Sequence, residues 1–266
     1  MPVLRTKTSR MWLPDALRGL ALLNMLAYHA MYDWVYVFGH ESSWYNIWAP
    51  GCHVWQQYIC WSFILLSGFS FPLAKRPAKN GLIVAGCAAV LTFVTAVFMP
   101  SEAIWFGVLH LNAAAVLLTC LVYPLLQRLP AGAGLAASAA LFALTNQLPE
   151  GYLGFENWRL CAVPAGLYKT NWFWLGLPDL TRFTSADYFP VVPWVFLFWC
   201  GVFLAGLWNA QKGRGARRAA SAVCHRAQYA AGLHAASARN LRCTVGVAHG
   251  AGVKGPKYEQ YKNFTI

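Results

Sequence analysis

The chain has 266 residues, of which 58% are hydrophobic and 11% charged, and it carries 13 tryptophans and a net charge of +12. A soluble domain keeps about a quarter of its residues charged, so this composition excludes an ordinary soluble protein and favours an integral membrane protein. Nucleic-acid binding is not expected, because the basic excess is concentrated in one segment: residues 213–266 hold nine Lys or Arg and one acidic residue.

Apolar runs long enough for membrane helices are the main feature of the rest of the chain. They lie near residues 17–38, 53–73, 80–98, 104–126 and 188–208, with a shorter Ala-rich run at 131–148. The first run follows a basic N-terminus, but it is long and lacks a small-residue cleavage site, so we expect a retained helix rather than a signal peptide. We therefore predict an all-α integral membrane protein with about six transmembrane helices.

The connecting segments alternate in charge. Segments 39–52 and 99–103 have no Lys or Arg, whereas 74–79 has three and 127–130 has one. Because positive loops stay on the cytoplasmic side, the pattern predicts a cytoplasmic N-terminus. The long segment 149–187, rich in Trp, Tyr, Pro and Gly, would then cap the opposite face.

A change of composition at about Gly213 separates a transmembrane domain, 1–212, from a basic Ala/Arg/Gly-rich tail, 213–266. Such a tail is typical of disordered segments near anionic lipid. Possible codons for residues 231–249, AGLHAASARNLRCTVGVAH, read one nucleotide later, spell the span-like LVYMLHQPVTYAVLLAWH. The tail is therefore either disordered or frameshifted, and the DNA across codons 208–266 would decide.

The first apolar run opens with LPDALRGLALLNM, in which Asp15 and Arg18 are three residues apart and can pair on one helix face. The pair could simply fix the depth of the helix, or Arg18 could bind phosphate groups on the cytoplasmic side, with Arg10 adding positive charge. Metal, serine-nucleophile and nucleotide-hydrolysing sites have no support: the eight cysteines form no CxxC pair, and GxSxG, HExxH and Walker motifs are absent.

Titratable residues interrupt the same run. His29 and Asp33 are four apart, so they share a helix face, and ionisable groups inside a span are costly enough to indicate function by default. We expect them to face the bundle interior; a plain helix–helix hydrogen bond is the alternative. His40 follows at the non-cytoplasmic end, where a loop histidine alone would indicate little.

Other polar positions lie in later runs. Ser67, Gly68 and Ser70 in WSFILLSGFSF favour close helix packing. His110 and Asn112 in FGVLHLN form a second polar island, and YFPVVPW places Pro190, Pro193 and Trp194 at the start of the last run, where they could form a pocket wall.

In combination, the segments DALRGLALLNMLAYH, SGFSF, FGVLH and YFPVVPW resemble the bacterial relatives of heparan-α-glucosaminide N-acetyltransferase, over about residues 10–210. The resemblance implies acetyl transfer from cytosolic acetyl-CoA to an amino sugar across the bacterial cytoplasmic membrane. It implies that His40 is catalytic, supported by His29 and Asp33. The donor would then be held by Arg18, Asp15 and Arg10. The acceptor pocket would be lined by His110, Asn112 and the proline segment, which we define as Pro190, Pro193 and Trp194.

The chain also departs from these relatives, which carry a further span with a YxxHQP-like segment; here YMLHQP occurs only in the shifted frame. The missing span leaves open that the chain is an inactive, truncated member of the family. A second alternative is a proton-coupled transporter that uses His29, Asp33 and His110 as a relay. The expected partners are membrane lipids, a glycan acceptor and a second copy of the chain.

Overall fold

A computed structural model describes residues 12–156, 158–179 and 181–210 of the chain. The chain divides into two units, 1–209 and 210–266, and the described residues lie almost entirely in the first. Arg10 and the tail 213–266 fall outside the described residues, so the donor role of Arg10 and the frameshift of the tail stay predictions.

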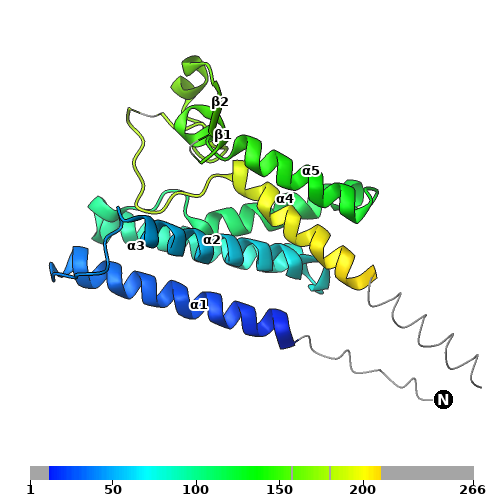
Figure 1. The fold of residues 1–266 in the computed structure, drawn as a ribbon, viewed down its shortest axis with the longest axis horizontal. Helices are drawn as coiled ribbons and strands as arrows, with labels where there is room; N and C mark the ends of the chain where they lie inside the picture. Colours follow the sequence, from blue (N-terminus) through cyan, green and yellow to red (C-terminus); the bar gives the residue numbers. More distant parts are fainter. Residues whose placement is uncertain (1–11, 157, 180, 211–266) are drawn as a thin grey trace, which may run out of the picture. The chain divides into compact units, whose positions relative to one another are not determined.

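Six long helices occupy the six apolar runs, and successive helices run in opposite directions (Figure 1). Their bounds are α1 Trp12–Tyr32, α2 Pro50–Ser70, α3 Pro77–Phe98, α4 Val108–Leu126, α5 Ala131–Thr145 and an unlabelled C-terminal helix Val191–Ala210, drawn in yellow. A five-residue π-helix, η1 Asp33–Val37, extends α1. Because successive helices alternate in direction, the segments 38–49, 99–107 and 146–190 lie at one end of the helices.

Three helices of the described part are long and apolar enough to cross a membrane: α3, α4 and the C-terminal helix. The polar residues at the starts of α1 and α2 make those helices less apolar, and α5 has only 15 residues. The prediction of a helical membrane protein is therefore confirmed. The count of six spans and the orientation of the N-terminus stay predictions.

A two-stranded antiparallel hairpin adds a small β element that the all-α prediction lacks. Its strands, β1 Tyr152–Phe155 and β2 Trp158–Ala162, follow α5 within the aromatic segment 149–187. The turn uses Glu156 at a positive φ of 49°. The chain can form a hairpin here because aromatic residues such as Tyr152, Phe155 and Trp158 favour extended backbone.

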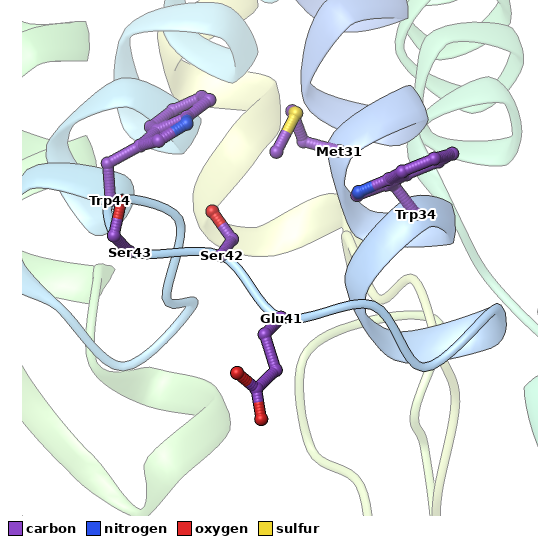
Figure 2. A pocket seen from close by; sticks show the side chains of 6 residues that line it. All are labelled: Met31, Trp34, Glu41, Ser42, Ser43 and Trp44. Atoms are coloured by element: carbon purple, nitrogen blue, oxygen red, sulfur yellow. The ribbon is translucent and has the colours of Figure 1, made fainter.

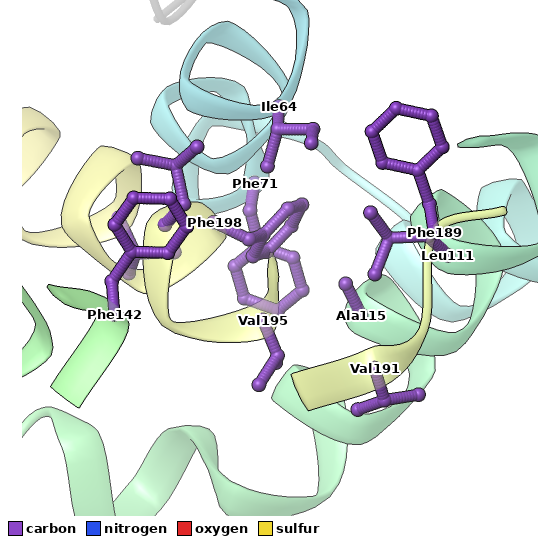
Figure 3. Packing of buried hydrophobic residues seen from close by; sticks show 11 residues of the cluster. Ile64, Phe71, Leu111, Ala115, Phe142, Phe189, Val191, Val195 and Phe198 are labelled. Carbon is purple, nitrogen blue, oxygen red and sulfur yellow. The ribbon is translucent and has the colours of Figure 1, made fainter. Parts of the chain in front are cut away.

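The C-terminal helix lies at the centre of the core and is the most buried of the three candidate spans. Its Val195, Phe198 and Val202 pack with residues of α2, of the short turn after it, of α4 and of α5: Ile64, Phe71, Leu111, Ala115 and Phe142 (Figure 3). Two hydrogen bonds cross this apolar core: Ser67 Oγ donates to Asn112 Oδ1 at 2.6 Å and Trp199 Nε1 donates to Thr119 Oγ1 at 2.9 Å.

Two glycines let α2 and the C-terminal helix approach closely. A Cβ atom added at Gly68 would overlap the carbonyl oxygen of Phe198, and one added at Gly201 would overlap the carbonyl oxygen of Leu65. Both obstacles are backbone atoms, which cannot move aside as a flexible side chain does. The prediction that the small residues near Gly68 serve helix packing is thus confirmed.

Candidate functional site

His40 lies just after the π-helix, where the backbone leaves the first helix. Its imidazole stacks on the indole of Trp34, with ring centroids 3.9 Å apart and an interplanar angle of 22°. Its backbone N–H donates to the carbonyl of Trp34 at 3.2 Å. The side chain is exposed and forms no hydrogen bond within the described part of the chain. Trp34 therefore orients the ring while both ring nitrogens remain free to exchange a proton.

The loop that carries His40 is held against α1 by tyrosines. Tyr45 is buried at 2% exposure, and its ring packs edge-on against Tyr28 and Trp55. Tyr36 accepts a hydrogen bond from the N–H of Ile47 at 3.2 Å. Aromatic packing of this kind is worth about 0.5–1.5 kcal/mol for each pair beyond the area that it buries. The segment after His40 is therefore anchored although it has no regular secondary structure.

A cavity of about 400 Å³ lies beside this loop. Six residues from the end of α1, from η1 and from the loop line it: Met31, Trp34, Glu41, Ser42, Ser43 and Trp44. Figure 2 shows the two indole rings on opposite sides, Met31 between them, and the Glu41 carboxylate turned outward. Because Trp34 both lines the cavity and stacks on His40, the cavity and the candidate base are adjacent.

His29 and Asp33 lie close to this region, but their side chains are exposed, contrary to the expectation that they face the bundle interior. The reason is that α1 packs mainly on α2, which leaves its other faces open. Among the described residues the two form no hydrogen bond or ion pair with each other. Instead, His29 Nδ1 lies 2.8 Å from the carbonyl of Met25. Since a carbonyl only accepts, Nδ1 carries a proton, and the neutral ring presents a bare Nε2.

Asp187, which the sequence reasoning missed, is a buried carboxylate at the start of α4. Its Oδ2 accepts a hydrogen bond from the N–H of Val108 at 3.0 Å, at the N-terminus of α4. Burial raises the pKa of Asp187, while this hydrogen bond opposes the rise. Asp187 thus joins α4 to the segment before the C-terminal helix.

Replacing Asp187 by Asn tests this burial. A carboxyl whose pKa is raised by folding stabilises the folded state fully at a pH below its usual pKa, about 3.9. This stabilisation is lost as the pH rises through the raised pKa. Asn cannot ionise and can still accept the Val108 N–H. The melting temperature of Asp187→Asn minus that of the wild type should therefore increase from about pH 3 to about pH 7.

Asp179→Asn is the matched control with the opposite sign. Hydrogen bonds from Thr181 lower the pKa of Asp179, so its contribution is present at neutral pH and is lost on acidification. The melting temperature of Asp179→Asn minus that of the wild type should become more negative as the pH rises from about 3 to about 7. A difference for Asp187→Asn that does not change with pH would contradict the burial argument.

His110 and Asn112 form hydrogen bonds to neighbouring helices, and their contact with an acceptor stays a prediction. Thr92 Oγ1 donates to the carbonyl of Ile104 at 2.7 Å, so it can only accept from His110 Nε2 at 3.1 Å. Asn112 accepts from Ser67. No hydrogen bond in the described ranges joins His110 to His29 or Asp33, and a proton relay through these residues stays an alternative.

The proline segment belongs to the core rather than to the cavity. Pro190 and Pro193 are among the most buried residues, and the Trp194 ring packs on Phe142 and Phe189. None of the three lines the cavity beside His40. They follow Asp187 closely, so they fix where the C-terminal helix begins. Their contact with an acceptor stays a prediction.

The predicted pair at the start of α1 forms. Arg18 Nη1 lies 3.1 Å from Asp15 Oδ1, and the two side chains are 42% and 40% exposed, respectively. An exposed pair of this kind adds little stability, so Arg18 remains available to a phosphate. Nineteen helical residues would place Arg18 about 29 Å from the far end of η1, close to the hydrocarbon thickness of a bilayer, about 30 Å.

The described residues contain no group of three His, Cys, Asp or Glu side chains that could hold a metal ion. Comparison with known proteins gives one finding: a family model described as heparan-α-glucosaminide N-acetyltransferase, catalytic, matches residues 10–237. Searches of curated proteins and of solved structures gave no match. The matched region includes every described residue and most of the chain. The chain therefore belongs to the heparan-α-glucosaminide N-acetyltransferase family and is an integral membrane protein.

Proposed function

We propose that the protein moves an acetyl group from cytosolic acetyl-CoA to an amino sugar, or another envelope glycan, on the opposite face of the bacterial cytoplasmic membrane. Family membership supports acetyl transfer. The observation that carries the choice of site is His40, an exposed imidazole with free ring nitrogens, oriented by Trp34 beside a cavity with polar and aromatic walls.

In the proposed reaction His40 is the general base. The acceptor nitrogen forms a bond to the thioester carbonyl carbon, the carbon–sulfur bond breaks, and the CoA thiolate leaves and takes up a proton. His40 accepts the proton that the nitrogen loses. The stacked Trp34 keeps the imidazole from rotating away during this transfer. The bare Nε2 of His29 makes that residue a second acceptor of protons near the same end of α1.

Arg18 is the proposed contact for the phosphates of acetyl-CoA, with Asp15 holding its guanidinium and Arg10 adding charge. The exposure of the Arg18 side chain supports this role. The length of the first helix, which separates Arg18 from His40 by about the thickness of a bilayer, also supports it. This arrangement puts donor recognition and the acceptor cavity at opposite membrane faces, with the N-terminus cytoplasmic and six helices spanning the bilayer. A homodimer in contact with membrane lipids is the proposed assembly.

Acetyl transfer by the purified full-length chain is the test. The protein is reconstituted into lipid vesicles with ¹⁴C-labelled acetyl-CoA outside and glucosamine inside, and the sugar is separated by chromatography. We expect labelled N-acetylated sugar that depends on the protein. Sugar flux without acetylation would instead support a transporter. Absence of product from this chain, with activity restored only in a frame-corrected gene, would identify an inactive truncated member.

A further inference from the structure

The outer strand of the hairpin carries an apolar surface that no residue in the described part of the chain covers. All five residues of β2 are exposed, and the side chains of Trp158 and Leu160 are 79% and 67% exposed. Arg159 lies between these two residues in the sequence. Large apolar side chains are more stable out of water than in it, so an aqueous position is unfavourable for this strand.

The inner strand fixes the direction in which this surface faces. Phe155 of β1 packs edge-on against Trp61 of α2 and against Phe142 of α5. At the turn, Glu156 Oε2 lies 3.7 Å from His53 Nε2, also on α2. The hairpin is therefore held against two helices by β1 and the turn, and β2 forms its outer side.

The hairpin lies at the level where the helices end. It follows α5, which packs closely on the C-terminal helix, a candidate membrane span: a Cβ atom added at Gly134 of α5 would overlap the ring of Phe203. In Figure 1 the hairpin lies beside the left-hand end of α5, and α1 and α3 extend further to the left than the hairpin does. The hairpin thus lies within the length that α1 and α3 cover, close to their ends rather than beyond them.

We propose that β2 is an interfacial anchor: Trp158 and Leu160 insert among the lipid headgroups at this end of the helices, and Arg159 binds lipid phosphate. Tryptophan is enriched at the boundary between membrane and water. The backbone limits the depth, because a two-stranded sheet leaves the outer edge of β2 without backbone partners, and such groups are not tolerated in hydrocarbon. The headgroup layer supplies water to this edge and removes both apolar side chains from bulk water.

The guanidinium of Arg159 is available to a phosphate. It lies 4.3 Å from the centroid of the Tyr152 ring, a cation–π contact that keeps it at the hairpin. Within the described ranges it forms no ion pair, and its planar set of N–H donors matches phosphate. A second copy of the chain could instead pair along the exposed edge of β2. An antiparallel pairing would bring two Arg159 side chains near each other, however, and like charges repel.

Tryptophan quenching in vesicles tests the anchor. The full-length chain is reconstituted with phosphatidylcholine and phosphatidylglycerol whose acyl chains carry bromine either near the headgroup or near the terminal methyl group. Subtracting the emission of Trp158→Phe from that of the wild type gives the emission of Trp158 alone. We expect strong quenching by the shallow bromine, weaker quenching by the deep bromine and little by iodide in the water. Trp61→Phe is the matched control, because Trp61 packs inside the bundle and should be quenched far less by the shallow bromine.

Bromine on only one of the two lipids tests the phosphate contact. At equal lipid concentrations we expect brominated phosphatidylglycerol to quench Trp158 about fivefold more than brominated phosphatidylcholine, because a basic residue at the surface attracts anionic lipid. Arg159→Gln should remove this preference. Lys169→Gln should keep it, because Lys169 is an exposed basic residue of the same aromatic segment but lies outside the hairpin.

Four results would overturn the inference. Quenching of Trp158 by iodide and by neither bromine would show that β2 faces water. Protection from all three quenchers would show that protein, such as a second copy, covers it. Stronger quenching by the deep bromine would contradict the interfacial depth, and a preference for phosphatidylglycerol that persists in Arg159→Gln would contradict the role of Arg159.

Discussion

Acetyl transfer is expected to fall by about 10²–10⁴-fold when His40 is replaced by alanine, the usual contribution of a general base. His40 is the exposed imidazole that adjoins the cavity, and its ring is held by Trp34 rather than by a hydrogen bond that would occupy one of its nitrogens. The loss should appear in kcat, because alanine leaves the cavity walls in place. Steady-state kinetics on reconstituted protein, at saturating donor, measures it.

His53→Ala is the control for this variant. His53 is also an exposed histidine in the same region of the chain, and its Nε2 lies 3.7 Å from Glu156 Oε2 in the turn of the hairpin. Its loss should leave kcat almost unchanged, because His53 does not line the cavity beside His40. Equal losses in the two variants would indicate a general effect on folding, and full activity in His40→Ala would exclude His40 as the base.

The largest expected effect on stability comes from Gly68→Ala. The added methyl group would overlap the carbonyl oxygen of Phe198, so α2 and the C-terminal helix would have to separate at the centre of the core. Overpacking of this kind costs about 1–3 kcal/mol. We expect a lower melting temperature, followed by tryptophan fluorescence or by the accessibility of the buried Cys52 and Cys200 to a thiol reagent.

Gly86→Ala is the matched control within a membrane helix. Nothing lies within 4 Å of a Cβ added at Gly86, on α3, so alanine should be neutral or slightly stabilising through its better helix propensity. Gly201→Ala should resemble Gly68→Ala, and the double variant should lose less than the two single losses combined, because the first substitution already separates the helices. Strict additivity would contradict a shared crossing.

Helix positions could be predicted from the sequence because a span needs about 20 apolar residues, and prolines mark where two helices begin: Pro50 and Pro77 occupy their first turns. The prediction was less accurate for the first helix. The apolar run at 17–38 gave no sign that the helix changes to a π-helix at Asp33, because hydropathy does not report the hydrogen-bond register of the backbone.

The candidate site was only partly predictable. The Asp15–Arg18 pair could be predicted because the two residues are three apart in the sequence. His40 was identified by the family resemblance. Asp187 was missed because its partner, Val108, is 79 residues away; only its position directly before YFPVVPW could have drawn attention to it. The cavity was missed because no spacing rule shows that the loop after η1 folds so that Trp34 and Trp44 line one space.

The π-helix at Asp33–Val37 has a consequence for how far this region can vary in length. A π-helix holds more residues per turn than an α-helix, and such segments are frequent at functional sites. Removing one residue between Trp34 and the end of this π-helix would rotate the later residues about the helix axis relative to Trp34, which would carry His40 off the Trp34 ring. Although residues 33–40 lead into an irregular loop, we expect insertions and deletions to be rarer there than in the hairpin turn.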